Sequence, residues 1–425
     1  MKKAIFFPAL LFAIIVNAQK INKIINAAEV ERVERILASD SLQGRKVNTP
    51  GIEKAADFII HEFKKAGLKP MQGTKGFRQN FEMLKPKLLS VDAQLDGVIV
   101  PAQNIIVVSP LEDVNVTERS SFQVVTAAAT DNFANVVQGS LQSGKNTIVL
   151  LDSSFQKSLP RITRFTRQIF SDAPTVIFVI GQNIPKKYSI TAKQSFDKMP
   201  LSNIAGILPG KTLPNEYVIF SAHYDHLGIG RPVKGDSIYN GANDDAAGTT
   251  AVIALAKYFK AMHNNKRTLV FATFTAEELG EVGSTYFSKQ IDASKVVALF
   301  NIEMIGTESK WGKNSAYMTG YDKTDMSKIL GENLKGTNFK FYPDPYLQEQ
   351  LFYRSDNASL AKLGVPAHTI STSKMDNEPN YHKVTDEIST LDMNNMAEII
   401  KAIAISSKTV VSGKDTPTRV APEAK

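Results

Sequence analysis

The stretch YVIFSAHYDH, residues 217–226, shows the pattern on which the fold prediction rests: an apolar, strand-like run that ends in polar residues. The pattern recurs in LVFATFT (269–275), followed by AEELG, and in VVALFNI (296–302), followed by EMIG. Between the first two runs, the Ala-rich segment 248–262 has the length and composition of a helix. Strands that alternate with helices indicate an α/β fold, with a mostly parallel mixed sheet and helices on both faces.

Polar residues follow each of the three runs, at the sheet edge where ligand sites of such folds lie. His223 is followed by Asp225, whose carboxylate could accept the second N–H of the imidazole. Glu277 and Glu278 are neighbours, so on an extended segment one could bind a metal while the other holds a water. Glu303 ends the third run, where a charge is costly unless it is paired or ligated.

Two further segments carry the same chemistry. NGANDDAAG (240–248) places Asp244 and Asp245 among small residues just before the helix, and NYHK (380–383) places His382 in a late polar loop. Each motif alone has a simpler explanation, such as a helix cap, a charged loop or a core histidine. Together they form an ordered set of imidazoles and carboxylates, which suits zinc, with manganese or cobalt as substitutes. One bridging carboxylate would make a two-metal site.

The composition limits the alternatives. The 425 residues include no cysteine, so a zinc site must use histidines and carboxylates, and no disulfide can stabilise the fold. The formal net charge is +8, but the basic residues are scattered, as in the pairs Lys64–Lys65 and Lys186–Lys187. No basic stripe with interleaved aromatic residues is present in the sequence, so we predict no nucleic-acid partner.

The first residues resemble a secretory signal. Lys2 and Lys3 precede an apolar run, 4–16, and Val16-Asn17-Ala18 predicts cleavage after Ala18. The alternative is a membrane anchor, but the run is shorter than the ~20 residues that a spanning helix needs. We therefore expect an exported protein, periplasmic or secreted, with no stable membrane insertion after cleavage.

The remaining segments suggest how the domains are organised. Helices are predicted for 24–37 and for a segment that opens at TPG (49–51) and closes at Gly67. Strand-like runs at 147–151 and 175–180 flank a basic helix near 162–169. This region is either a small inserted α/β module or a part of the main sheet. The predicted limits are 1–18 for the signal, 19–109 with 198–407 for the main domain, 110–197 for the inserted module and 408–425 for a flexible tail.

The ordered motifs resemble those of the two-zinc aminopeptidase family, whose relatives include glutamate carboxypeptidase, the glutaminyl cyclases and the transferrin-receptor ectodomain. The resemblance begins with LASDSLQGR (37–45) and TPG (49–51), and it is strongest from NIAG (203–206) through His382. The inserted module is loosely similar to the protease-associated insert of some relatives.

This resemblance implies a role for each candidate residue. His223 matches a ligand of one zinc ion and Asp225 its orienting acid. Asp244 matches the carboxylate that bridges both metals, joined to Asp245 by a cis peptide. Glu277 matches the general base, and the remaining ligands are Glu278, Glu303 and His382. Two departures stand out: Glu303 is one methylene longer than the usual Asp, and SDN (355–357) stands where many relatives read Ser-Asp-His.

The expected activity is therefore the hydrolysis of N-terminal peptide bonds in peptides with a free amino group. Three alternatives remain. A glutaminyl cyclase would use a similar fold with one zinc, and a carboxypeptidase would need a cation for the substrate's carboxylate, for which Arg354 is a candidate. A non-catalytic binding protein would be expected to have lost ligands, whereas this sequence keeps the whole set.

Overall fold

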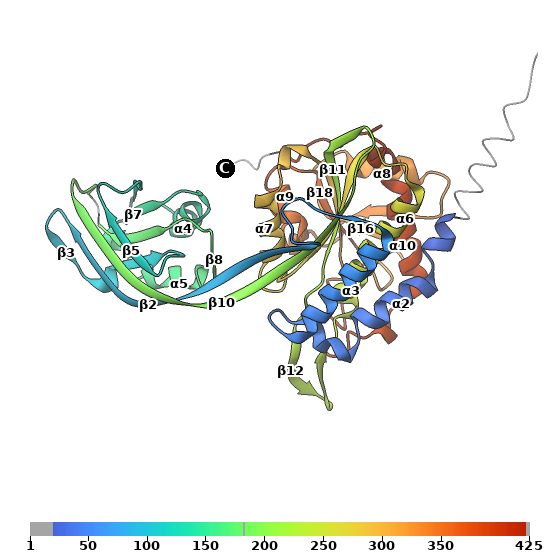
Figure 1. The fold of residues 1–425 in the computed structure, drawn as a ribbon, viewed down its shortest axis with the longest axis horizontal. Coiled ribbons are helices and arrows are strands. Elements are labelled where there is room, and N and C mark those ends of the chain that lie inside the picture. Colours follow the sequence, from blue (N-terminus) through green and yellow to red (C-terminus); the bar gives the residue numbers. More distant parts are fainter. Residues whose placement is uncertain (1–19, 182, 422–425) are drawn as a thin grey trace, which may run out of the picture. The chain divides into compact units, whose positions relative to one another are not determined.

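The computed structural model describes residues 20–421, apart from residue 182 (Figure 1). The chain forms two compact units: one combines the residues up to 80 with those from 201 onward, and the other is Phe81–Pro200. The second unit is wider than the 110–197 predicted for the insert, because strands before residue 110 also belong to it. The predicted signal, 1–18, lies outside the described residues. Among the described helices, none combines the length and apolar character needed to cross a membrane.

The first unit carries the larger share of the helices and strands. In chain order its main elements are α2 (Ala27–Leu37), α3 (Pro50–Ala66), β1 (Lys69–Pro70), the end of β10 (Tyr188–Leu208), β11 (Leu213–His223), β12 (Gly228–Val233), β13 (Asp236–Tyr239), α6 (Ala247–Met262), β14 (Arg267–Phe274), α7 (Val282–Gln290), β15 (Val296–Ile302), β16 (Ser315–Met318), α8 (Met326–Leu334), β17 (Lys340–Pro343), α9 (Asn357–Ala361), β18 (Ala367–Ser371), α10 (Met393–Ser406) and α11 (Lys408–Val411).

The strands of this unit form a mixed sheet in the order β17-β16-β18-β15-β11-β14-β10. The pairs β11/β14, β11/β15, β15/β18 and β16/β17 are parallel, whereas β10/β14 and β16/β18 are antiparallel. The prediction of a mostly parallel mixed sheet is thus confirmed. In register, His223 lies beside Phe274 and Ser221 beside Asn301, so β11, β14 and β15 end at the same edge.

Helices cover both faces of the sheet (Figure 1). On one face Phe220, Phe271 and Phe300 stack together, and Phe259 of α6 packs on Phe220 with ring centroids 5.2 Å apart. On the other face Phe274 contacts Phe287 of α7, again with centroids 5.2 Å apart. Successive strand residues point to opposite faces, so strands buried on both sides read as continuous apolar runs, as these do.

Helix α3 illustrates how the sequence sets an element's limits. Pro50 occupies the first turn, where its missing N–H removes no hydrogen bond. Gly67 ends the helix in the left-handed conformation, with φ of 75°, and its N–H donates to the carbonyl of Lys64. Ala56, Ile59 and Phe63 are buried. The predicted start and stop of this helix are confirmed.

The second unit has its own core. Its elements are most of β2 (Arg78–Leu95), β3 (Val98–Val100), β4 (Ile105–Val108), β5 (Asp113–Thr117), β6 (Gln123–Ala127), α4 (Phe133–Gln142), β7 (Thr147–Leu151), α5 (Ile162–Phe165), β8 (Ile169–Phe170), β9 (Val176–Ile180) and most of β10. One sheet has the order β4-β9-β7-β6, in which β7 runs parallel to both neighbours. The strands predicted at 147–151 and 175–180 are β7 and β9. The unit combines this separate four-stranded sheet with strands β2, β3, β5 and β8, which belong to the same sheet as β10.

The C-terminal segment differs from the flexible tail predicted for 408–425. As far as residue 421 it packs against the first unit, and Val420 is buried in the core beside Val365. The buried guanidinium of Arg267 explains the order: it donates to the carbonyls of Val410 and Asp415, at 2.7 and 2.6 Å. The polar composition of the segment reflects these bonds rather than mobility.

Candidate metal centre

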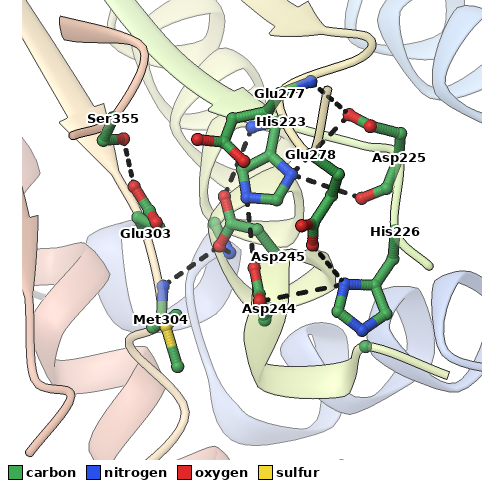
Figure 2. A network of polar contacts seen from close by, with 12 residues as sticks. His223, Asp225, His226, Asp244, Asp245, Glu277, Glu278, Glu303, Met304 and Ser355 are labelled. Atoms are coloured by element: carbon green, nitrogen blue, oxygen red, sulfur yellow. Dashed lines mark hydrogen bonds and ion pairs between the residues drawn. The ribbon is translucent and has the colours of Figure 1, made fainter. Parts of the chain in front are cut away.

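Five elements deliver the predicted site residues to one edge of the sheet. His223 is the last residue of β11, Glu277 and Glu278 follow β14, and Glu303 follows β15. Asp244 comes from the turn Ala242–Ala246 before α6, and His382 comes from the loop before α10. Figure 2 shows His223, Asp244, Glu277, Glu278 and Glu303 grouped together. The grouping follows from the parallel register of the strands.

Asp244 lies at the centre of the group. Its Oδ1 is 3.2 Å from Nε2 of His223, and its Oδ2 is 3.2 Å from Nε2 of His382. The two oxygens of a single carboxylate thus face two different imidazoles. The peptide bond from Asp244 to Asp245 is cis, as the resemblance implied.

One glutamate accompanies each imidazole. Glu303 offers a carboxylate oxygen to the group of His223 and Asp244, with all three ligand atoms within 4.8 Å of one another. Glu278 places Oε2 3.2 Å from Nε2 of His382. Asp244 is therefore shared by two clusters: the first is His223, Asp244 and Glu303, and the second joins Asp244 and Glu278 with His226, while His382 lies 3.2 Å from both acids of this second cluster.

The donor set fits metal ions. Nε2 of His223, Oδ2 of Asp244 and Oε1 of Glu278 are buried, and among the described residues their short contacts are only with one another's side chains and with His226 and His382, in directions that are poor for hydrogen bonding. Such orphaned groups are costly unless something binds them. Zinc holds nitrogen and oxygen ligands at about 2.0–2.2 Å in a tetrahedron, which sets neighbouring ligand atoms about 3.3 Å apart. The 3.2 Å separations between Asp244 and the two histidines match this spacing.

His226 is a member of the site that the sequence reading did not assign. Its Nδ1 lies 2.8 Å from Oε1 of Glu278 and 3.8 Å from Oδ2 of Asp244, and its side chain is fully buried (Figure 2). The ring packs on Gly241, where a Cβ would come within 2.5 Å of the ring carbon Cγ. The sequence feature that could have predicted His226 as a site residue is its position three residues after His223, in the same motif.

Asp225 differs in part from its predicted role. Nδ1 of His223 lies 3.2 Å from the backbone oxygen of Asp225 and 3.8 Å from its carboxylate Oδ1. That same Oδ1 accepts the backbone N–H of Glu277, at 3.1 Å. Asp225 therefore contacts His223 mainly through its carbonyl, while its carboxylate holds the backbone of Glu277. Burial raises the pKa of Asp225 to about 6.

A buried chain of hydrogen bonds holds Glu303, the residue with the unexpected length. The hydroxyl of Ser355 donates to Oε2 of Glu303 and accepts from Nδ2 of Asn301, at 2.7 Å (Figure 2). Ser221 donates in turn to Oδ1 of Asn301, at 2.9 Å. The extra methylene is accommodated because Ser355 fixes one carboxylate oxygen. Asn357, the second departure, instead donates to the carbonyl of Phe352, at 2.9 Å.

The backbone around Asp244 is fixed by residues that lie outside the five ligands. The carboxylate of Asp386 accepts the N–H groups of Asn243 and Asp244, at 2.8 and 3.1 Å. The buried guanidinium of Arg45 donates to the carbonyls of Asn240 and Gly241, at 2.6 and 2.8 Å. Arg45 belongs to the LASDSLQGR motif, which the sequence reading quoted only for its resemblance. Asp386 was not predicted, since it follows His382 in a loop without periodicity.

The small residues after Asp244 have a steric reason. A Cβ on Gly248 would lie 2.0 Å from the carbonyl oxygen of Ile302 and 2.4 Å from Oδ2 of Asp245. Asp245 needs this space, because its carboxylate accepts N–H groups from Gly248, Met304 and His223, at 2.9, 3.1 and 3.3 Å. Asp245 thus ties the turn to the ends of β11 and β15.

Burial of so many acids shifts their proton affinities. Burial raises the pKa of Glu277 well above its usual range; the carboxylates of Glu303 and Asp356 add to the effect, and His223 opposes it. Burial also raises the pKa of Glu278, but hydrogen bonds with His226 and His382 outweigh it and lower the value to about 2. Burial would lower the pKa of His382, yet Asp244 and Glu278 raise it to about 10. The carboxylates of Asp244 and Glu278 thus stabilise a positive charge between them.

Comparison with known proteins agrees with this geometry. Residues 203–406 match the model of Peptidase family M28. The chain is 27% identical over 232 residues to "Leucine aminopeptidase 1" of Aspergillus niger, an alignment that covers 52% of this chain and 58% of the relative. It is 30% identical over 111 residues to a "Probable zinc metalloprotease" of Pyrenophora teres f. teres, covering 26% of this chain and 23% of the relative. The matches thus span little more than half the length of the first relative and less of the second.

A solved structure shows the same fold over nearly the whole chain. The aminopeptidase from Aneurinibacillus sp. strain AM-1 superposes with a TM-score of 0.54 at 18% identity, covering 96% of this chain and 98% of that one. At this identity the likeness establishes the fold. The mixed α/β architecture described above is therefore shared with the structure of that aminopeptidase.

Proposed function

The segment from residue 203 to residue 406 belongs to peptidase family M28, and on this premise we propose that the protein is an exported aminopeptidase dependent on two zinc ions. One observation carries the proposal: the two oxygens of Asp244 face different histidines, each at 3.2 Å. A carboxylate so placed can bridge two cations. His223 and Glu303 would complete one metal position, and Glu278 and His382 the other.

Zinc is the metal that best suits these ligands. The chain offers imidazoles and carboxylates but no thiolate, and a matched relative is named a probable zinc metalloprotease. Cobalt or manganese would be substitutes for the same donor set. Zinc bound at such a site activates a water molecule and polarises the carbonyl of the scissile bond.

Glu277 is the proposed general base. Its side chain points toward Glu303 and His223 in Figure 2, while its backbone is fixed by Asp225. Burial raises its pKa, a shift in the direction that is common for carboxyl groups that exchange protons in active sites. The carboxylate of Glu277 takes the proton of the attacking water and returns it to the leaving amine.

The concentration of acids explains why a free amino terminus would be recognised. Glu277, Glu278 and Glu303 surround the mouth of the site, and none of them pairs with a lysine or an arginine in any described ion pair. A protonated or metal-bound amine is favoured in such surroundings. The alternative carboxypeptidase requires a free cation, whereas Arg354, which lines a small cavity beside Glu303, is paired with Glu349 at 2.8 Å.

The activity is tested with matched peptide substrates, one with a free N-terminus and one N-acetylated, incubated with and without a metal chelator. We expect release of the N-terminal residue from the free peptide alone, with loss of activity in chelator and recovery on adding zinc. Cleavage of both peptides, release of the C-terminal residue, or cyclisation of an N-terminal glutamine without hydrolysis would contradict the proposal. Mass spectrometry of the products separates these outcomes.

Export forms a separate part of the proposal and rests on the N-terminal sequence. The charged residues, the apolar run and Ala18 match a cleavable signal. Expression of the full chain followed by N-terminal sequencing of the extracytoplasmic protein should show a start at Gln19. A protein retained with an intact N-terminus would contradict export.

A further inference from the structure

A small cavity opens directly beside the proposed metal ligands. Its volume is about 50 Å³, and its wall includes Glu303 and the neighbouring Met304. Tyr381 also lines the cavity, and its ring stacks on the imidazole of His382 with ring centroids 3.9 Å apart. The cavity is therefore lined by one proposed ligand, Glu303, and by Tyr381, the neighbour of a second one, His382.

The position identifies which part of a substrate would enter. Under the proposed function, the free amine and the scissile carbonyl both lie at the metal centre. The atom between them is the Cα of the N-terminal residue, and we assign the side chain on this atom to the adjoining cavity, while the rest of the peptide leaves the centre from the other side of the scissile carbonyl. Three larger cavities among the described residues share no residue with the centre; they are lined by residues such as Gln194, Leu363 and Asn338.

The volume decides which side chains fit. A cavity of about 150 Å³ holds one benzene ring, which is about 25 Å³ for each of six carbon atoms. On that scale, about 50 Å³ holds two non-hydrogen atoms. Alanine has one such atom beyond Cα and serine has two. Leucine has four and phenylalanine seven, so both exceed the space.

Much of the wall is fixed by the sheet. Tyr317 of β16 and Ser371 of β18 are cross-strand partners, and both are buried. The hydroxyl of Ser371 accepts the N–H of Ser373 at 3.2 Å and donates to the carbonyl of Met304 at 3.4 Å. These groups cannot move apart without breaking the sheet edge. Their hydroxyls also make the cavity compatible with a polar side chain as small as serine.

We propose that this cavity selects peptides whose N-terminal residue is alanine or serine. The proposal rests on the aminopeptidase function above and narrows it to a substrate class. It differs from the preference that the name of the leucine aminopeptidase relative would suggest. The physical cause is the small volume of the cavity, about 50 Å³.

The direct test compares aminoacyl p-nitroanilides of alanine, serine, leucine and phenylalanine with the zinc-loaded full chain. We expect kcat/KM for alanine and serine to exceed that for leucine by about tenfold or more, within the range that a few methylene groups can impose. Phenylalanine should be slower still. Equal or faster hydrolysis of the leucine substrate would overturn the proposal.

A pair of leucine variants tests whether the cavity itself is responsible. Leu351 lines the cavity, whereas Leu347 lies four residues earlier and is 75% exposed outside it. Leu351→Ala removes three non-hydrogen atoms from the wall and should raise the leucine-to-alanine ratio of kcat/KM about tenfold. Leu347→Ala should leave the ratio unchanged. An unchanged ratio in Leu351→Ala, or an equal change in both variants, would contradict the assignment.

A binding measurement separates failure of this inference from failure of the proposed function. Amino-acid hydroxamates bind metal through the hydroxamate and present the side chain without turnover. Calorimetry with the zinc-loaded chain should give tighter binding of L-alanine hydroxamate than of L-leucine hydroxamate. If no aminoacyl substrate is hydrolysed but this order holds, the aminopeptidase proposal fails and the cavity assignment stands. Tighter binding of the leucine compound overturns the cavity assignment.

Discussion

At the residue scale, the proposed function rests on the two carboxylate oxygens of Asp244. Oδ1 and Oδ2 each lie 3.2 Å from a different histidine, and neither distance could be read from the sequence. The sequence predicted five candidate ligands, because each follows an apolar strand or stands in a small-residue or polar motif. It did not identify His226, Ser355 or Asp386, whose roles depend on contacts between distant segments.

Glu277→Gln removes the proposed base while keeping the size of the side chain. We expect kcat to fall by about 10²–10⁴, the usual contribution of general acid–base catalysis, while zinc binding remains. Steady-state kinetics with metal analysis measures both quantities. Glu281→Gln, a half-buried acid in the same loop, is the matched control and should stay within a few-fold of wild type. Near wild-type turnover in Glu277→Gln would refute the role.

His226→Leu tests the contact with Glu278. In the structure Nδ1 of His226 lies 2.8 Å from Oε1 of Glu278, a contact that leaves Oε2 facing His382. Loss of a group that orients a metal ligand typically weakens metal affinity by about 10–100-fold. We expect this weakening for one of two zinc ions, measured by competition with a chromogenic chelator. His226→Asn, which keeps a donor close to the Nδ1 position, should recover much of the affinity.

The control for the histidine variant is His61→Leu, because His61 is exposed on α3 and belongs to neither candidate metal cluster. It should bind both zinc ions as wild type does. A His226→Leu protein that binds zinc with unchanged affinity would show that the contact with Glu278 does not orient the ligand.

At the element scale, helices α2 and α6 meet through a buried acid. Glu34 is fully buried, its Oε2 accepts from the hydroxyl of Thr250 at 2.7 Å, and burial raises its pKa to about 8. In the unfolded chain its pKa is about 4.3. The folded state therefore binds more protons between these values, so the stability contributed by this group is lost as the pH rises from about 4 to 8.

Glu34→Gln removes this pH dependence because the amide does not ionise. The gain in Tm relative to wild type should be larger at pH 8 than at pH 5, where wild-type Glu34 is mostly protonated. Thermal unfolding at the two pH values, with metal present, measures the difference. A gain that is equal at both values, or larger at pH 5, would contradict the raised pKa.

A second prediction at the element scale concerns the bonds that hold the C-terminal segment. Arg267 is buried and donates to the carbonyls of Val410 and Asp415 and to the hydroxyl of Thr416. Arg267→Leu leaves these acceptors and Glu216 without their partner, which should destabilise the fold by about 3–5 kcal/mol. Denaturant unfolding checks the value. The exposed Arg35, paired with Glu31 on α2, is the control, and Arg35→Leu should cost less than about 1 kcal/mol.

Elements were predictable from sequence where local signals were strong. The strand at 296–302 and the helix that opens at Pro50 were predicted because apolar runs, proline and glycine mark their limits. The segment after residue 408 was not, because its order comes from a buried arginine more than 140 residues away in sequence. The start of the second unit, Phe81, was also missed, since β2 is continuous in sequence across it.

At the scale of the whole molecule, the metal centre belongs to the first unit alone. Every proposed ligand lies after residue 201, and the cavity beside the centre is lined by residues of the same unit. The proposed chemistry and the proposed choice of N-terminal residue therefore rest on residues of this unit. The second unit contributes no described residue to the centre.

The central claim is that one chain holds two zinc ions through Asp244. The most direct measurement is titration of metal-free protein with zinc, followed by calorimetry and by elemental analysis after removal of excess metal. The account predicts two zinc ions per chain in wild type, and fewer than two tightly bound ions in Asp244→Asn, because both positions depend on this carboxylate. A wild-type stoichiometry of one or zero, or an Asp244→Asn protein that still binds two ions tightly, would contradict it.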